Sequence, residues 1–223
     1  MTIRAKLYAA IVLSILGPLV TTAVALQGMF DMGDSFDEVR DRGRHEAIAL
    51  ESKFGVTDVN GWQTAYGYDD GASRPVFERS VAAFRTDLRR AARTLTDPRE
   101  RELLSELRRE FAEFMRLDRV AYRALQRGET EVVKRIFLGP ELAQFSAMAD
   151  TAELLAHYER QRATASEQAF DDARDDARKR LIAVALGAAL VIVLLLVTAW
   201  DVARMALEGE RHVRSREGDQ SAG

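Results

Sequence analysis

Cysteine is absent from this chain of 223 residues, and histidine occurs only three times. The missing thiols exclude disulfide bonds, thiolate catalysis and cysteine-ligated zinc or iron–sulfur centres. His45, His157 and His212 are scattered, without the close spacing typical of metal ligands. The sequence also has no serine nucleophile elbow and no glycine-rich phosphate loop. We therefore expect no enzymatic activity, no metal site and no bound cofactor.

A large excess of either charge is also lacking. The chain has 32 basic and 35 acidic residues, which gives a formal net charge of −3. Proteins that bind nucleic acid usually present a strongly basic surface to the phosphate backbone. Nucleic acid is therefore not an expected partner.

Proline is scarce, with four residues in the chain, and within residues 31–180 each proline follows a helix-breaking signal. The stretches between these breaks are rich in Ala, Arg, Glu and Leu, which favour helices. Asp97 before Pro98 is typical of an N-cap followed by proline at the first helical position. The sequence predicts four helices, at 31–70, 75–95, 98–127 and 141–180, with a short extra turn or helix at 129–138.

Heptad spacing of apolar residues supports each predicted helix. In the first helix the repeat is Ile48, Ser52, Gly55, Val59, Trp62 and Tyr66; in the second it is Phe77, Val81, Phe84, Leu88, Ala91 and Leu95. The third repeats Leu104, Leu107, Phe111, Phe114, Asp118, Ala121 and Leu125, and the fourth opens with Leu142, Phe145, Ala149, Ala152 and Leu155. Short breaks join antiparallel neighbours, so the expected fold is all-α, an up-down-up-down four-helix bundle.

Two long uncharged apolar runs flank this bundle, at 7–30 and 181–200. Their 24 and 20 residues are enough for a helix to cross a hydrocarbon core of about 30 Å. We therefore expect two transmembrane helices continuous with the first and last bundle helices. The bundle domain spans 31–180, and the tails are 1–6 and 201–223. The first run has an alternative interpretation as a cleaved signal peptide, because Ala23-Val24-Ala25 is a small-x-small site.

The orientation of the spans is predicted from the basic residues beside them. Arg4 and Lys6 precede the first run, and a basic N-terminal tail favours the cytoplasm for both termini. The raw count of Lys and Arg near the span ends favours the opposite arrangement, but long domains translocate largely regardless of their charge. We expect a two-pass protein of the cell membrane with its bundle outside the cytoplasm.

An aromatic and polar patch near the end of the first helix is the candidate ligand site. Its members are Trp62, Gln63, Tyr66, Asp69 and Arg74. Aromatic walls with a few polar groups are common in small-molecule sites. The alternative interpretation is that Trp62 and Tyr66 fill core positions of the bundle.

Two further polar residues fall on or beside the predicted core stripes. Asp118 lies on the stripe of the third helix, and Asn60 lies beside that of the first. A buried carboxylate must be paired or protonated. Asp118 could therefore pair with an arginine or respond to pH, or it could fix the register of the helices.

The layout of span, bundle and span resembles the sensor module of bacterial methyl-accepting chemotaxis receptors. The resemblance covers about residues 1–205, and it rests on this layout together with four stretches: 58–66, 122–129, 132–138 and 140–142. It implies a homodimer whose bundle binds a ligand and signals by helix displacement. Such receptors continue into a relay domain and a long cytoplasmic coiled coil, whereas only 201–223 follows the second span here.

These features together predict a membrane-bound sensor that works without catalysis. Its expected partners are the lipid bilayer, a second copy of the chain, a small-molecule ligand and a separate cytoplasmic signalling protein. An alanine stripe at Ala165, Ala169, Ala173 and Ala177 favours close helix packing. Two alternatives remain open: a membrane scaffold that senses nothing, and the N-terminal part of a longer receptor.

Overall fold

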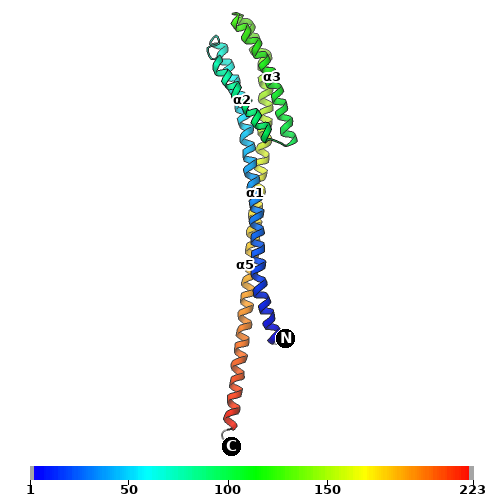
Figure 1. Ribbon diagram of the computed structural model, residues 1–223, viewed down its shortest axis with the longest axis vertical. Coiled ribbons are helices and arrows are strands. Elements are labelled where there is room, and N and C mark those ends of the chain that lie inside the picture. The colour runs from blue at the N-terminus through cyan, green and yellow to red at the C-terminus, as the bar shows by residue number, and fades with distance from the viewer. Residues whose placement is uncertain (1–2, 221–223) are drawn as a thin grey trace. The chain divides into compact units, whose positions relative to one another are not determined.

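The computed structural model describes the backbone of residues 3–220 and the side chains of Tyr8, Ile11, Val12, 14–200, Ala203 and Arg204. All the described elements are helices, as Figure 1 shows: α1 (Ile3–Tyr68), α2 (Arg74–Thr94), α3 (Pro98–Gln126), α4 (Thr130–Ile136), η1 (Phe137–Glu141) and α5 (Leu142–Gln220). The predicted all-α class is confirmed. The predicted bounds of the second and third helices are correct to within one residue. The ends of the two predicted tails, 1–2 and 221–223, lie outside the described residues.

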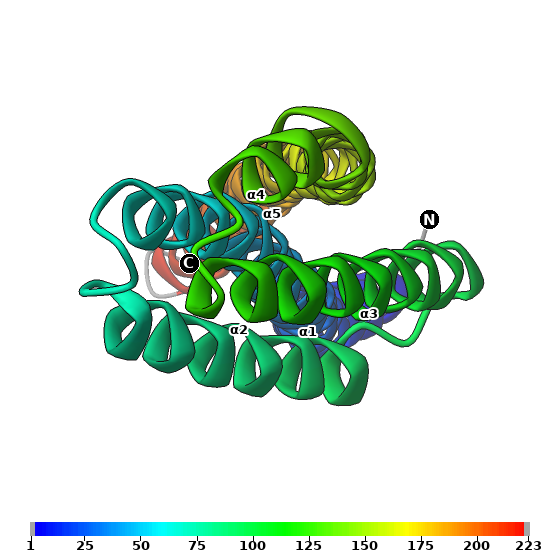
Figure 2. The same cartoon turned by 90° about the horizontal axis from the view of Figure 1, so that it is seen from above.

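The described chain divides into two compact units. Unit 1 comprises residues 1–35 and 170–223, and unit 2 comprises residues 36–169. Helices α1 and α5 contribute residues to both units. Unit 2 is a helical bundle in which α2 and α3 lie side by side (Figure 2), and Arg108 of α3 donates a hydrogen bond to the carbonyl of Leu88 of α2 at 2.8 Å.

Local hydrogen bonds fix the breaks between the helices of unit 2. After α1, Asp70 and Gly71 have positive φ angles of 52° and 93°, and the Asp69 carboxylate accepts bonds from the backbone N–H and the hydroxyl of Ser73. Asp97 caps α3: its carboxylate accepts from the Arg99 N–H at 2.9 Å. The Glu100 side chain returns a bond to the Asp97 N–H at 2.8 Å, which completes a capping box with Pro98 at the start of the helix. The predicted N-cap is confirmed.

The core of unit 2 follows the heptad prediction closely in α2 and less closely in α1. All six predicted positions of the second helix are buried. In α1, however, Trp62 is 37% exposed, and Val56 and Gln63 are buried instead of Gly55 and Trp62. Leu142 at the start of α5 is also exposed. A straight helix has 3.6 residues per turn, so its buried face drifts from a strict seven-residue repeat.

Close packing at one glycine of α1 gives a testable prediction. A Cβ added to Gly67 would overlap the ring of Phe137, whereas a Cβ at Gly61 would meet nothing within 4 Å. We expect Gly67→Ala to lower the free energy of unfolding by about 1–3 kcal/mol because the ring must move. Gly61→Ala should raise it by about 0.5–1 kcal/mol through helix propensity. Urea unfolding followed by far-UV circular dichroism would measure both, and equal effects would contradict the packing.

Unit 1 contains the apolar parts of α1 and α5. By length and composition both helices can cross a membrane, with mean hydropathies of 1.3 and 3.0 over their most apolar windows. Large apolar side chains in these parts are exposed, among them Leu19, Leu190 and Leu196. Asp31 and Arg180 form an ion pair at 3.9 Å.

Candidate functional site

A buried ion pair joins α2 to α3 near the break that follows α1. Arg74 donates two parallel hydrogen bonds to Asp118, from Nη1 to Oδ1 at 2.8 Å and from Nη2 to Oδ2 at 3.0 Å. The Asp118 side chain is fully buried, and that of Arg74 is 12% exposed. The Tyr66 hydroxyl of α1 donates to the same Asp118 Oδ1 at 2.5 Å. Such forked, charge-assisted bonds are the strong ones in proteins.

Aromatic rings surround the Arg74 guanidinium. Its Cζ atom lies 4.9, 4.6 and 4.3 Å from the ring centroids of Tyr66, Phe77 and Tyr122. Tyr66 also packs edge-to-face on Phe77, with centroids 5.4 Å apart. A desolvated cation over several ring faces is strongly held. The aromatic cage is therefore filled by the chain's own arginine.

A second buried carboxyl lies beside this pair. Glu141, the last residue of η1, is 2% exposed. Its Oε1 accepts a hydrogen bond from the amide of Gln63, which also lies 3.5 Å from Asp118 Oδ1. Its Oε2 is buried without a hydrogen-bond partner among the described side chains. An unsatisfied buried polar atom is costly and calls for a ligand, an ion or a water molecule.

A cavity of about 410 Å³ opens onto Glu141, and we call it the Glu141 cavity. Its polar wall is formed by residues including Asn60, Gln63, Thr64, Asp70 and Glu141, and its apolar wall by Leu125, Val133, Phe137, Leu138 and Leu142. This volume lies within the usual range of about 300–1,000 Å³ for small-molecule sites. The cavity thus combines a mainly apolar lining with one buried carboxyl.

Burial controls the ionisation of this cluster. Burial, and then the negative charge of Asp118, raise the pKa of Glu141 to about 8, although the bond from Gln63 and the charge of Arg74 oppose the shift. Burial and Asp118 also raise the pKa of Tyr66 well above its ordinary value. Near neutral pH, Glu141 is therefore mostly a neutral acid. It can lose its proton when a cation enters the cavity.

Comparisons with models of protein families, with curated proteins and with solved structures find no match to this chain. The candidate site therefore rests on its own geometry.

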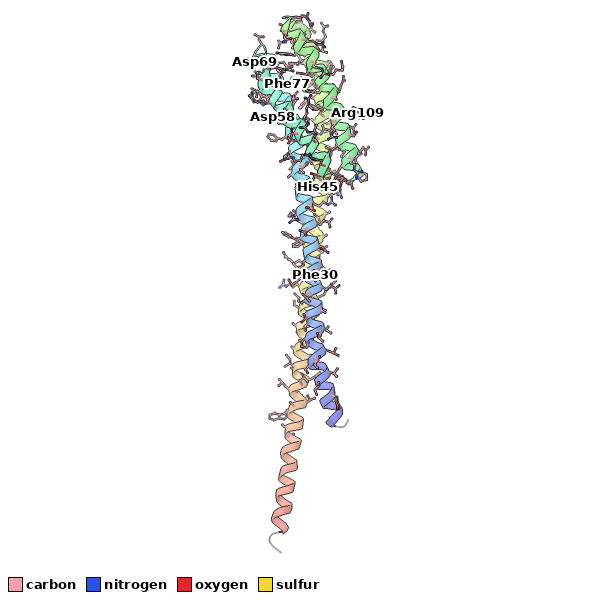
Figure 3. The ribbon with its side chains drawn as sticks, viewed as in Figure 1. Phe30, His45, Asp58, Asp69, Phe77 and Arg109 are labelled. Atoms are coloured by element: carbon pink, nitrogen blue, oxygen red, sulfur yellow. The ribbon has the colours of Figure 1, made fainter. Side chains whose placement is uncertain are left out.

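The structure brings together only part of the patch that the sequence predicts. Gln63, Tyr66 and Arg74 meet around Asp118, and Asn60 is half-buried and lines the cavity. Trp62 lies apart from this cluster and donates its indole N–H to Asp58 at 3.1 Å. Asp69 stabilises the turn after α1, because its carboxylate accepts hydrogen bonds from Ser73. Figure 3 labels Asp69 and Asp58.

Sequence reasoning missed Glu141. The residue lies between Pro140 and Leu142, one position away from the predicted heptad stripe of the last helix. The π-helical turn of η1, which contains Pro140 and the non-helical Gly139, precedes α5, and the buried face begins at Glu141 rather than Leu142. Such turns often occur at functional sites. The only signal available from the sequence was an acid placed directly after Gly-Pro.

Proposed function

We propose that this chain is a membrane-anchored, receptor-like sensor that binds a small cationic ligand in the Glu141 cavity and works without catalysis. The observation that carries this proposal is the buried Glu141 Oε2, unpartnered at the wall of a cavity of ligand size. A protonated amine would ionise Glu141 and form a charge-assisted bond with it. The apolar part of the ligand would pack on Val133, Phe137 and Leu138.

A carboxylate ligand is a poorer fit for this site. Arg74 is the buried cation beside it, but its Nη atoms bind Asp118 and its Nε donates to Glu78 at 3.2 Å. Lys134 at the rim is paired with Glu131 at 3.1 Å. Glu141 and Asp70 therefore leave the cavity more suited to positive charge.

A binding experiment on the full chain in lipid nanodiscs tests the ligand class. Calorimetry would compare butylamine with butyrate and butanol, which share its apolar chain. We expect only the amine to bind, and its affinity to rise about tenfold per pH unit between pH 6 and 8 as Glu141 loses its proton more easily. Glu141→Gln should abolish this binding, whereas Glu129→Gln, at an exposed ion pair with Arg127, should leave it unchanged.

Two results would count against the proposal. Equal binding of butyrate would contradict the cationic class. Binding of none of the three compounds would favour the alternative of a membrane scaffold.

Signal transfer in this proposal follows the helices themselves. The bundle is proposed to be up-down-up-down, with the spans continuous with α1 and α5, so that a helix displacement of about 1–2 Å carries the signal. A homodimer and a separate cytoplasmic protein that binds 201–223 complete the mechanism. Ala165 and Ala169 are exposed and available for helix contacts between copies.

The proposed orientation places residues 31–180 outside the cytoplasm. We expect protease added to intact cells to digest this part, because its charged loops would be accessible. Protection of residues 31–180 while a control ectodomain is cut would reverse the orientation. Immunoblotting with an antibody against unit 2 would report the result.

A further inference from the structure

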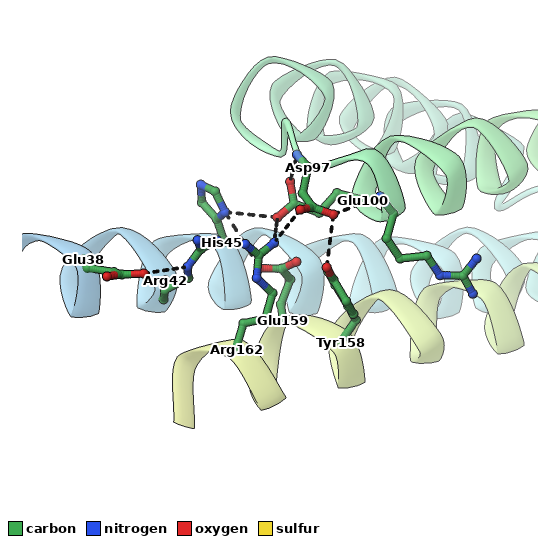
Figure 4. A network of polar contacts seen from close by, with 9 residues as sticks. Glu38, Arg42, His45, Asp97, Glu100, Tyr158, Glu159 and Arg162 are labelled. Carbon is green, nitrogen blue, oxygen red and sulfur yellow. Dashed lines mark hydrogen bonds and ion pairs between the residues drawn. The ribbon is translucent and has the colours of Figure 1, made fainter. Parts of the chain in front are cut away.

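A second buried polar cluster lies in unit 2, away from the Glu141 cavity: Figure 3 labels His45 at one end of unit 2 and Asp69 at the other. We call it the His45 cluster, and its members are His45 of α1, Glu100 of α3 and Glu159 of α5. The Glu100 and Glu159 side chains are fully buried, and that of His45 is 17% exposed. Figure 4 shows the three side chains converging from three helices.

We propose that the His45 cluster binds a divalent first-row transition-metal ion such as Zn²⁺. The His45 Nδ1 atom lies 3.4 Å from Glu100 Oε1 and 3.8 Å from Glu159 Oε2. One ligand atom from each residue lies within 4.8 Å of the others. Zinc bonds of about 2.0–2.2 Å place tetrahedral ligand atoms about 3.3–3.6 Å apart. A small inward movement of Glu159 therefore completes a three-residue site with a fourth position open.

Unpartnered atoms supply the independent observation. Both carboxylate oxygens of Glu159 and the Nδ1 of His45 are buried, and among the described side chains Glu159 meets the facing carboxyl of Glu100 but no hydrogen-bond donor. Buried polar atoms that lack a hydrogen-bond donor call for a cation or a water molecule between them. A metal ion among the three side chains would be a partner for these atoms.

The charges around the cluster favour a divalent ion. Arg162 lies 3.1 Å from Glu100 Oε1 and 3.4 Å from Asp97 Oδ2, so Arg162 and Asp97 balance each other. Arg42, the other cation near Glu159, pairs with Glu38 at 3.8 Å, so Glu100 and Glu159 leave two negative charges at the cluster. One divalent ion neutralises them. A nitrogen ligand beside two carboxylates suits zinc and its neighbours, whereas magnesium and calcium prefer oxygen alone.

The capping box of α3 positions Glu100, and a nearby cavity gives an ion access to the His45 cluster. The Oε2 of Glu100 accepts the Asp97 N–H of the capping box, which leaves Oε1 directed toward His45 and Arg162, whose Nη1 donates to it at 3.1 Å. Hydrogen bonds of this kind orient metal ligands and strengthen binding. A cavity of about 400 Å³, with Glu38 and Asp41 in its lining, reaches His45 and Glu100. Arg42 and Arg162 also line this cavity, with Arg42 3.8 Å from Glu38, so the cavity gives an ion a path to the site.

The sequence does not indicate this site. Its members lie 55 and 59 residues apart, because each comes from a different helix. Close spacing of histidines is a different pattern from one histidine that meets two glutamates from distant parts of the chain. The prediction of no metal site therefore rested on a pattern that this cluster does not follow.

Metal content and affinity of the full chain in detergent micelles test the proposal. After treatment with EDTA, loading with ZnCl₂ at pH 7.5 and desalting, elemental analysis should find about one zinc per chain. A competition titration with a chromophoric chelator gives the affinity. We expect His45→Gln and Glu159→Gln each to weaken binding at least tenfold. The controls are His157→Gln and Glu153→Gln, at exposed positions of α5, which should bind zinc like the unaltered chain.

A second measurement needs no variant. Co²⁺ added to the unaltered metal-free chain should give the visible absorption of a four- or five-coordinate site, and Zn²⁺ should displace it. A zinc content well below one per chain, a six-coordinate Co²⁺ spectrum, or equal affinity in all four variants would each overturn the proposal. The outcome is independent of the Glu141 cavity, because amine binding does not involve these residues.

Discussion

Asp118→Asn should strongly destabilise unit 2. The change keeps the size of the side chain but leaves the Arg74 guanidinium buried without its counter-charge. Breaking a buried ion pair by removing one partner typically costs about 3–5 kcal/mol. The amide NH₂ also replaces one of the two oxygens that accept from Arg74, and the lost hydrogen bond adds to this cost. Urea unfolding of the full chain in micelles, followed by far-UV circular dichroism, would measure the change.

Glu113→Gln is the matched control for this experiment. Glu113 lies on the same helix and also receives two hydrogen bonds from one arginine, Arg116, at 2.8 and 2.6 Å. That pair is exposed, so its loss should leave the free energy of unfolding almost unchanged. Similar losses for Asp118→Asn and Glu113→Gln would show that burial of the Arg74 pair does not matter.

Glu141→Gln should make the stability of unit 2 less sensitive to pH and should stabilise it at pH 8. The pKa of Glu141 is about 8 in the folded chain, against an ordinary value of 4.5. Between these values the folded state holds a proton that the unfolded state has released. The stability from this group is therefore complete below about pH 4.5 and is lost as the pH rises toward 8. A neutral glutamine removes this loss, which amounts to about 1.4 kcal/mol per pH unit.

The pH experiment compares three proteins at pH 5, 6, 7 and 8. Glu159 has a raised pKa of about 7 and shifts stability in the same direction, so the Glu141→Gln variant should keep part of the slope. Glu131→Gln, at an exposed position of α4, should retain the full slope. An unchanged slope in Glu141→Gln would show that Glu141 is ionised in the folded chain.

The helices and most of their core faces could be predicted from the sequence because their signals are local. Asp97-Pro98 with Glu100 marks the start of α3, and Asp70-Gly71 marks the turn after α1. In the predicted second helix, 75–95, every core residue assigned by apolar spacing, from Phe77 to Leu95, is buried. Periodicity was less accurate in α1, where seven-residue spacing assigned Trp62 to the core and 3.6 residues per turn placed Gln63 there.

Both candidate sites depended on contacts between distant residues. Asp118 was expected to need a partner, but only the folded bundle identifies Arg74 and Tyr66 as that partner, 44 and 52 residues away. Glu141 is buried because the turn before α5 shifts the buried face by one position, and the heptad spacing does not show this shift. His45, Glu100 and Glu159 have no common sequence pattern at all.

The sequence alone determined an all-helical chain with two helices apolar enough to cross a membrane, because turn chemistry and hydrophobic spacing act over a few residues. Tertiary structure alone decided which polar side chains are buried together. Burial and the approach of charges from separate helices set the pKa of Glu141 and of Glu159, and these depend on three-dimensional proximity rather than on spacing along the chain.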